Sequence, residues 1–423
     1  MQNFLSFIKH NYKFASSFIL IFYVSLLDYH SSVDKVSFQW IYLSAVSIIL
    51  LIYFFWLNLN FNLTDFKRPY FVSTLGFYFF SLISFFYSDS IYESIISFSR
   101  LSIILVVLLI LYKSVQILKP SFLFISYLVS IFLLFESLYS LKPLLEILSV
   151  TDFDPQFSTF LKGVTGNKNI TSAILAIKIP FVFYILLKSR YFIIRLLSFL
   201  LIVSTFVTLF FLSTRGILLS FLVIYSFIFL VLILQKKFIN LFLISSPVIL
   251  SIIIFNVSIS SNNSYSLTER VSSIATPSES SVSARLRYYT HALEQIKQTP
   301  LTGVGLGNWK IKSVLFDSQN IVGYTVPYNV HNDLLEFGAE IGIIGSLFYF
   351  LSFLLLFFLL FKFYRNGFFE NSILLVLFSS LFIYFIDLNL NFPTYRPAAH
   401  INLLLIVAII LNLNNFSLQN EEN

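Results

Sequence analysis

The stretch IGIIGSLFYFLSFLLLFFLLF, residues 341–361, decides the fold class of this chain. It contains no charged residue, and its apolar side chains cover every side of a helix. A helix needs about 20 apolar residues to cross a bilayer core roughly 30 Å thick. A barrel strand would instead alternate apolar and polar residues over about ten positions. The stretch therefore predicts a transmembrane α-helix.

Similar apolar runs recur along the 423 residues of the chain. Hydrophobic residues make up 57% of it and charged residues 11%, with a mean hydropathy of +0.86, which excludes a soluble globular protein. We predict an all-α integral membrane protein with about 12 transmembrane helices. They are expected near residues 14–28, 36–57, 70–88, 91–112, 121–141, 169–187, 196–212, 216–234, 238–256, 341–363, 372–388 and 397–413.

The distribution of cations predicts the orientation of these helices. If the N-terminus is cytoplasmic, the inner segments hold thirteen Lys and Arg residues, and the short outer loops hold only Lys35, Arg215 and Arg396. This bias follows the positive-inside rule, from which long loops are exempt. Both termini are then cytoplasmic. The net charge of +7 reflects this topology, so no nucleic-acid partner is expected.

The helices divide the chain into three parts. Residues 1–256 hold transmembrane helices 1–9, residues 257–340 form one large external loop with short helices, and residues 341–423 hold helices 10–12 and a cytoplasmic tail. The first run is expected to remain as a signal anchor, because no small-residue cleavage site follows it. Without cysteine, the loop has to be ordered by packing against the bundle.

The loop begins with a segment rich in Ser, Asn and Thr, which predicts a surface loop over 258–283. Ser283 then fits as the cap of a helix that runs to about Gln298. Its apolar stripe contains Leu286, Tyr289, Ala292, Leu293 and Ile296, and Arg285 falls inside that stripe.

The same helix carries a second arginine, Arg287, on the opposite face with His291. A guanidinium on the docking face needs an anionic partner, because an unpaired buried charge is costly. Arg285 is therefore the better ligand candidate. Arg287 is interpreted as a solvated charge, with a direct substrate role left open.

Three alternate glycines follow in TGVGLGNW, residues 302–309. The segment lacks the lysine and the spacing of a Walker loop or a dinucleotide-binding motif. One interpretation is a tight turn that brings the backbone close to the bundle. The other is a nest in which the amides around Gly303 and Gly305 bind phosphate.

The loop ends in VHNDLLEFG, residues 330–338. Asn332 or Asp333 fits as the N-cap of a short helix, which places His331 at its mouth. A single histidine is often structural, but imidazole titrates near neutral pH and is suited to act as a general base.

Two other outer segments carry candidate residues. Arg215 lies in the short connection between two apolar helices, where a guanidinium either binds phosphate or extends towards lipid headgroups. Asn169 fits as the cap of the helix that begins near residue 169, and the segment before it is expected to line the same vestibule.

Other charged residues are given less weight. Arg100, Glu136, Lys178 and Asp387 fall in or beside apolar runs, where an internal ion pair, such as Glu93 or Glu136 with Arg100, is one explanation. Asp152 and Asp154 have the Asp-x-Asp spacing of some metal sites, but a hydrophilic turn is favoured, and no metal site is predicted.

Together these motifs resemble the O-antigen ligase and polymerase superfamily of membrane-embedded bacterial envelope glycosyltransferases. The resemblance covers most of residues 163–391. Its motifs are GNKN at 166–169, STRG at 213–216, SARL at 283–286, TPLTGVGLG at 299–307 and HNDLLEFG at 331–338. Their order around one large loop is more specific than any one motif.

The resemblance implies an inverting, metal-independent glycosyltransferase without a cofactor. Its donor would be a glycan on undecaprenyl diphosphate, and its acceptor a hydroxyl of the lipid A core or of another glycan, within membrane lipids. Arg215 and Arg285 would hold the diphosphate, and His331 would act on the acceptor hydroxyl. Arg287, Asn169, Asn332, Gly303 and Gly305 are further candidates for substrate binding. The implied location is the bacterial inner membrane, with the active site facing the periplasm.

An O-antigen ligase is the preferred prediction. A polymerase that joins lipid-linked repeat units, or a ligase that transfers glycan to protein, would share the same loop. A non-catalytic transporter of polysaccharide lipids is a lesser alternative, in which the arginines only bind.

Overall fold

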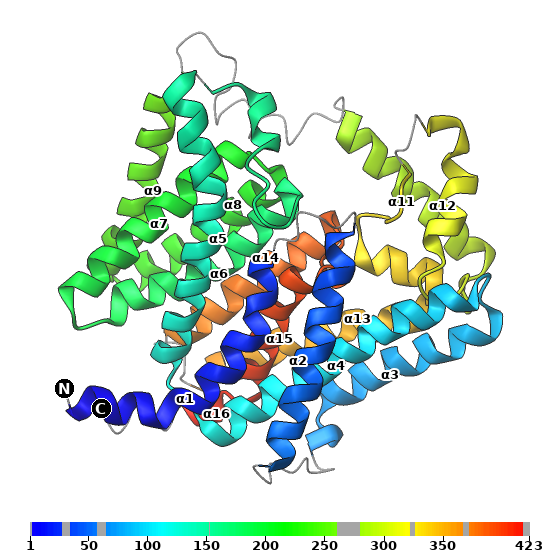
Figure 1. The fold of residues 1–423 in the computed structure, drawn as a ribbon, viewed down its shortest axis with the longest axis horizontal. Helices are drawn as coiled ribbons and strands as arrows, with labels where there is room; N and C mark the ends of the chain where they lie inside the picture. Colours follow the sequence, from blue (N-terminus) through cyan, green and yellow to red (C-terminus); the bar gives the residue numbers. More distant parts are fainter. Residues whose placement is uncertain are drawn as a thin grey trace.

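The computed structural model describes residues 2–27, 34–56, 65–151, 153–259, 280–321, 326–366 and 372–417. These residues form helices and connecting turns and contain no β-strand, which confirms the predicted all-α fold class (Figure 1). The α-helices are α1 (Gln2–Phe22), α2 (Lys35–Trp56), α3 (Pro69–Ile83), α4 (Ile91–Leu118), α5 (Phe122–Val150), α6 (Lys168–Lys188), α7 (Phe192–Leu212), α8 (Arg215–Leu234), α9 (Phe238–Ser258), α11 (Ser280–Gln298), α12 (Trp309–Asp317), α13 (Asp333–Arg365), α14 (Ser372–Leu390), α15 (Pro397–Leu411) and α16 (Asn414–Ser417). Short 3-10 turns are η1 (Tyr23–Leu26), η2 (Asp65–Lys67), η3 (Ser84–Tyr87), η4 (Pro155–Thr159), η6 (Ser318–Asn320) and η8 (Pro393–Tyr395).

Ten of the described helices are long and apolar enough to cross a membrane, namely α2 to α9, α13 and α14. Two of the twelve predicted runs differ from this set. The first lies mostly in α1, which begins at Gln2 and ends at Phe22, where η1 takes over. The last forms α15, which is apolar but has only 15 residues. The chain is thus a multi-pass membrane protein.

The centre of the bundle is formed by helices that are buried on nearly every side. In α6 the share of buried residues reaches 94% over its most apolar window. Within it, Lys178 Nζ lies 2.6 Å from both carboxylate oxygens of Glu136 on α5. A buried charge needs such a partner, because leaving water is costly for an isolated ion.

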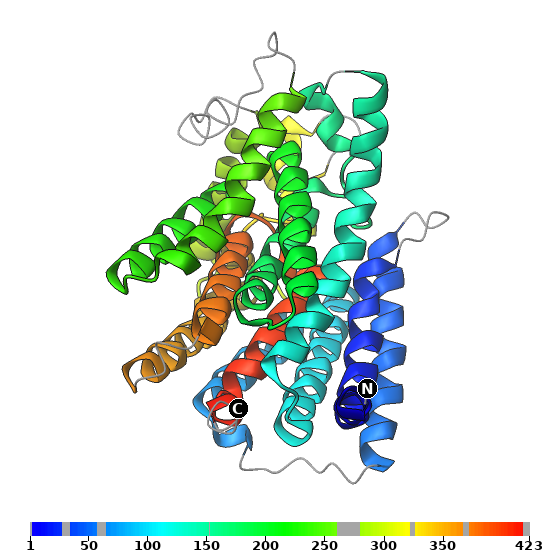
Figure 2. The same cartoon turned by 90° about the vertical axis from the view of Figure 1, so that its left-hand side faces the viewer.

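The two marked ends of the chain lie at the same end of the molecule in both views (Figures 1 and 2). Helices α11 and α12 lie at the opposite end, above the start of α13 (Figure 1). The polar segment that carries most of the predicted site residues therefore caps one end of the helical bundle.

A kink in α13 fixes this cap to the bundle. Gly342 has a φ of 79°, which interrupts the helix and frees the carbonyl groups before it. Val304 N donates to Ala339 O at 3.0 Å and Gly305 N donates to Glu340 O at 2.8 Å. In return, Ile343 N donates to Pro300 O at 2.8 Å. The glycine-rich segment and the kink thus satisfy each other's backbone groups.

Candidate functional site

Helix α11 presents Arg285 and Tyr289 to the interior of the site. It begins at Ser280, so the prediction that Ser283 caps it is wrong, but its end at Gln298 agrees with the sequence. Tyr289, Ala292 and Ile296 pack into a small apolar cluster with Trp309, Val330 and Ala339. Leu286 and Leu293 do not join this cluster and are 52% and 46% exposed. The docking face is therefore narrower than the predicted apolar stripe.

Arg287 has a different environment. Its Nε and Nη2 atoms donate to the two carboxylate oxygens of Asp317 on α12, at 2.6 and 3.2 Å. The hydrogen bonds that Arg287 donates to Asp317 raise the pKa of Arg287. The Arg287 side chain is 33% exposed, in line with the prediction of a solvated charge, but it also ties α11 to α12. Its direct role in substrate binding stays a prediction.

His331 lies at the mouth of α13, as the capping motif predicts. Asn332 is the N-cap, and its side-chain oxygen accepts a hydrogen bond from Leu335 N at 3.1 Å. The short helix is continuous with the transmembrane helix through the Gly342 kink. His331 itself has a φ of 63°, a left-handed conformation that is uncommon outside glycine. The Tyr289 hydroxyl lies 3.1 Å from its carbonyl oxygen and 2.8 Å from that of Asn389.

The imidazole of His331 is enclosed by aromatic rings and cations. Its ring centroid lies 4.9 Å from that of Phe392, edge to face, and 6.2 Å from that of Tyr288. Burial, together with the charges of Arg285 and Arg396, lowers the pKa of His331 to about 4. The imidazole is therefore neutral near pH 7. Its Nδ1 atom is buried and has no hydrogen-bond partner among the described residues.

The start of α8, which carries Arg215, lies against the end of α14. Helix α7 is followed by a left-handed Ser213, and Arg215, which was predicted to lie in the connection, is the first residue of α8. A Cβ atom on the adjacent Gly216 would lie 2.7 Å from Leu390 Cδ1. The preceding residue, Asn389, contacts both Tyr289 and Asn332. The structure thus brings Arg285 and His331 together, and the end of α14 connects the start of α8 to the residues beside them. A place for Arg215 in the same site stays a prediction.

Two residues of the site have roles that the sequence did not predict. Asp387 is buried, and its charge acts on Arg285 against the lowering of the arginine's pKa by burial. Arg396, which the sequence identified only as an outer-loop cation, lies 5.1 Å from the Phe392 ring and acts electrostatically on His331. The sequence did contain a signal for Asp387, because an ionisable residue within an apolar run marks a candidate functional site.

The glycine segment and Asn169 fit structural roles. Gly303 N donates to Thr299 O at 2.9 Å, and Gly305 N is engaged by the α13 kink. This arrangement supports the tight-turn interpretation; substrate binding by Gly303 and Gly305 stays a prediction. The cap of α6 is Asn167, not Asn169, since the Asn167 side chain accepts from Asn169 N at 2.9 Å. Whether Asn169 binds substrate also stays a prediction.

The other acidic residues named from the sequence have specific partners where the structure describes them. The prediction of an internal ion pair is confirmed for Glu136, but its partner is Lys178 and not Arg100. Glu93 pairs with Lys310 of α12. Asp154 caps the turn η4 by accepting from Gln156 N at 2.8 Å, as a hydrophilic turn would. Asp152, the other half of the Asp-x-Asp spacing, lies outside the described residues.

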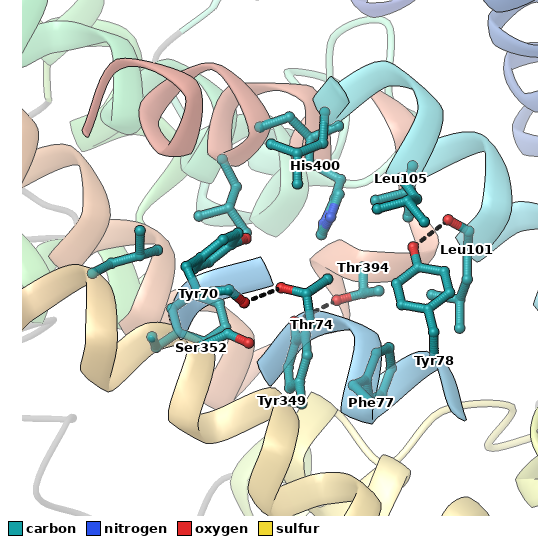
Figure 3. A pocket seen from close by; sticks show the side chains of 16 residues that line it. Tyr70, Thr74, Phe77, Tyr78, Leu101, Leu105, Tyr349, Ser352, Thr394 and His400 are labelled. Atoms are coloured by element: carbon teal, nitrogen blue, oxygen red, sulfur yellow. Dashed lines mark hydrogen bonds between the residues drawn. The ribbon is translucent and has the colours of Figure 1, made fainter. Parts of the chain in front are cut away.

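Two cavities adjoin the site. The larger, of about 590 Å³, lies between α2, α4, α12, the start of α13 and η8, and Arg396 lines it. The smaller, of about 50 Å³, lies deeper, among α3, α4, α13 and α15 (Figure 3). His400 points into it, and Thr394 connects it to Asp333 through a hydroxyl that donates to the carboxylate at 2.6 Å. The smaller space is large enough for water but not for a sugar ring.

Comparison with known proteins identifies the segment that carries these residues. Residues 200–350 match a family model described as O-antigen ligase. They form an O-antigen ligase family domain. No curated protein matches the chain. The ligase family match contains Arg215, Arg285 and His331, and it confirms the superfamily predicted from the sequence.

The ligase family domain indicates the general kind of activity. Proteins of this family are ligases and polymerases that resemble glycosyltransferases, so the chain has a function of the O-antigen ligase or polymerase type. The match ends before Asp387, Phe392 and Arg396, which complete the surroundings of His331.

Proposed function

We propose that the protein is an O-antigen ligase that transfers a glycan from undecaprenyl diphosphate to a sugar hydroxyl of the lipid A core. One observation carries this proposal: the guanidinium groups of Arg285 and Arg396 lie beside a neutral His331 whose Nδ1 atom has no partner among the described residues. Cations next to a free base fit a reaction with an anionic leaving group and a hydroxyl nucleophile.

The reaction follows from these roles. The acceptor oxygen forms a bond to the anomeric carbon of the donor glycan, and the bond between that carbon and the diphosphate oxygen breaks. The electron pair leaves with the diphosphate, and the hydroxyl proton passes to His331. Attack opposite to the leaving group inverts the anomeric centre. Arg215 and Arg285 stabilise the charge that develops on the diphosphate, and this chemistry requires no metal ion.

The bound donor also improves the base. Without donor, burial together with the charges of Arg285 and Arg396 holds the pKa of His331 at about 4 and so weakens its basicity. A diphosphate held by Arg285 would cancel much of the charge of that arginine. The pKa of His331 would then rise by the part of its lowering that this charge causes, which makes general-base catalysis more effective.

Reconstitution tests the proposal. The purified protein is mixed with labelled undecaprenyl-diphosphate oligosaccharide, with and without lipid A core, in the presence of a chelator. Label on the core lipid that disappears in His331→Ala would support a metal-independent ligase. A ladder of longer lipid-linked products without core would instead identify a polymerase. Transport of the lipid-linked glycan without glycosyl transfer would instead indicate a transporter, in which the arginines only bind the substrate.

We place this reaction at the periplasmic face of the bacterial inner membrane, with both termini in the cytoplasm. The charge distribution along the chain supports this orientation. The position of both marked ends opposite α11 and α12 is consistent with it (Figure 1).

A further inference from the structure

Two short connections carry a group of cations at the end of the bundle far from His331. Helix α8 starts beside the end of α14, so it runs away from the site and the α8–α9 connection lies at the far end, where α14 begins. Helix α7 leads directly into the start of α8, so the α6–α7 connection lies at the far end too. We call the cations of these two connections and of the first turn of α7 the basic rim: Lys188, Arg190, Arg195, Lys236 and Lys237.

The packing of α7 against α9 makes the two connections neighbours. Both helices begin at the far end and run towards the site. Ser251 Oγ, near the middle of α9, donates to Val203 O, near the middle of α7, at 3.2 Å. The cations that precede the two helices therefore form one surface.

The protein does not neutralise the basic rim. Residues 155–268 contain no Asp or Glu. Within the described part of the chain, none of the five cations forms an ion pair, and Arg195 donates only to a backbone carbonyl, that of Ser189. By contrast, Lys113 of α4 pairs with Asp65. The positive-inside rule accounts for cations at this end, but not for a group of them without acids.

The backbone of Lys236 is unusual. Lys236 has a φ of 56°, and it follows α8 at the position that glycine normally occupies. Its N–H donates to Ile233 O, and that of Lys237 donates to Leu232 O, both at 2.9 Å. A lysine is strained here where glycine would not be. The chain thus has a cation where the local backbone favours a residue without a side chain.

An apolar cavity of about 50 Å³ adjoins the basic rim. It lies between α6, α8, α9 and α14, and its volume is sufficient for several methylene groups. Leu187, which precedes Lys188, and Ser372, the first residue of α14, both line it. The Ser372 hydroxyl oxygen is buried and has no hydrogen-bond partner among the described residues. The cavity is therefore apolar along the helices and polar where it meets the cations.

Exposed apolar side chains surround the cations. Tyr191 and Phe192 precede and begin α7, and Phe238 and Ile239 begin α9; all four are exposed. Aromatic residues beside cations are typical of the level at which lipid headgroups meet the hydrocarbon core. The basic rim is thus placed at headgroup level.

We propose that the basic rim and the adjoining cavity bind an anionic phospholipid of the nearby leaflet. Its phosphate would lie among Lys188, Lys236 and Lys237, and one acyl chain would enter the cavity past Leu187 and Ser372. Basic pockets between transmembrane helices suit such headgroups. The site lies at the opposite end of the bundle from Arg285 and His331, and it does not depend on the proposed reaction.

Native mass spectrometry tests the headgroup part of this site. The detergent-solubilised full chain is titrated with phosphatidylglycerol and with phosphatidylcholine of the same acyl chains. We expect phosphatidylglycerol to bind more tightly, and Lys236→Gln with Lys237→Gln to weaken its binding by about fivefold for each lysine. Lys67→Gln with Lys119→Gln is the matched control, because it removes two cations from the same end and Lys119 is also left-handed, with a φ of 43°. It should leave the affinity unchanged.

Equal affinity of the wild type for the two lipids would overturn the proposal. An equal loss in both double variants would overturn it as well, since it would show only a general attraction to the positive end of the bundle. Because the exchanged lysines lie in surface connections, the melting temperature of each variant should stay close to that of the wild type.

A second comparison tests the acyl chain. Leu375→Trp fills the cavity from a half-buried position and should weaken phosphatidylglycerol binding. Glycerol 1-phosphate, which has the phosphate without the chains, should not displace the lipid. If Leu375→Trp does not fold, phosphatidylglycerol with six-carbon chains replaces it and should bind more weakly than the long-chain lipid. Displacement by glycerol 1-phosphate, or binding that is insensitive to both the filled cavity and the chain length, would contradict a lipid site.

Discussion

His331 combines a left-handed backbone with a buried, neutral ring. Left-handed backbone costs roughly 1–3 kcal/mol outside glycine and persists only where the surroundings enforce it. Here Tyr289 contacts the His331 carbonyl oxygen and Asn332 caps the following helix. These contacts hold His331 in its left-handed conformation.

Replacing His331 with Asn separates chemistry from backbone strain. Asn adopts the left-handed region readily, so His331→Asn should leave the free energy of unfolding nearly unchanged. We expect kcat to fall by about 10²–10⁴-fold, the usual contribution of a general base. His291→Asn is the control, since His291 stacks on Phe316 away from the site. Equal activity of the two variants would contradict a catalytic His331.

The pH dependence of the reaction tests the charges around His331. Its lowered pKa means that the active, neutral form persists below pH 6.5 and is lost only near pH 4 in the free protein. We expect the acid limb of kcat/KM near pH 4, and that of kcat, measured with donor bound, at a higher pH. Arg396→Gln removes one cause of the shift and should move the kcat/KM limb upwards. An unchanged limb would show that Arg396 does not act on this group.

Substitution of Arg285 should mainly affect catalysis, whereas substitution of Arg287 should mainly affect stability. Arg285→Gln removes a cation beside His331 and should raise the donor KM and lower kcat, with a small change in stability. Arg287→Gln removes the ion-pair partner of the buried Asp317, which keeps a hydrogen bond from Asn320, and should reduce the free energy of unfolding by about 1–3 kcal/mol. Adding Asp317→Asn should restore part of that loss. Abolished turnover in Arg287→Gln alone, with Arg285→Gln active, would reverse the assignment.

At the scale of elements, the glycine segment and the α13 kink act as one unit. A Cβ atom on Gly342 would lie 2.2 Å from Leu301 O, and one on Gly303 would lie 2.4 Å from the Glu340 backbone. These contacts explain why the turn after α11 and the kink have left-handed glycines where they meet.

Alanine substitution measures this fit. Gly166→Ala is the control, because Gly166 has a φ of 71° with nothing within 4 Å of its would-be Cβ atom. It should cost only the left-handed penalty of about 1–2 kcal/mol. Gly342→Ala adds a backbone collision to the same penalty and should lower the melting temperature clearly more. Equal melting temperatures of the two variants would show that the turn and the kink are not tightly packed.

At the scale of the whole molecule, the absence of cysteine permits a direct test of orientation. Tyr328→Cys introduces an exposed thiol beside the site, and Arg190→Cys introduces one between α6 and α7. An impermeant maleimide should label Tyr328→Cys in spheroplasts, and Arg190→Cys only after the membrane is opened. The unmodified chain is the blank. The reverse pattern would place the site in the cytoplasm.

The helices could be predicted from the sequence because each apolar run is a local property. The runs at 70–88 and 216–234 lie close to the observed spans of α3 with η3 and of α8. Prediction was weaker at the ends of the chain, where α1 begins at Gln2 and α15 is short. The starts of α11 and α6 also differ from the predicted caps, Ser283 and Asn169, because several residues near each start can cap a helix.

The site could be predicted only where its residues carry a local signal in the sequence. Arg215, Arg285 and His331 each stand next to a local signal: a short connection, a helix face and a cap. Arg396 and Asp387 were not assigned roles, since their importance arises from neighbours in other elements. The partners of Glu136 and Arg287 could not be predicted either, because residues that form an ion pair between two helices have no characteristic spacing in the sequence.

The sequence by itself determined that this chain is a helical membrane protein with a polar segment carrying arginines and a capped histidine. Apolar content and helical periodicity are sufficient for that conclusion, since water and lipid sort side chains by polarity. Only the tertiary structure decided which charges meet. The kink at Gly342, the glycine turn and the end of α14 bring distant residues around His331, and they also create the polar cavity beside it. Electrostatic effects of this kind depend on distance in space, which the order of residues does not specify.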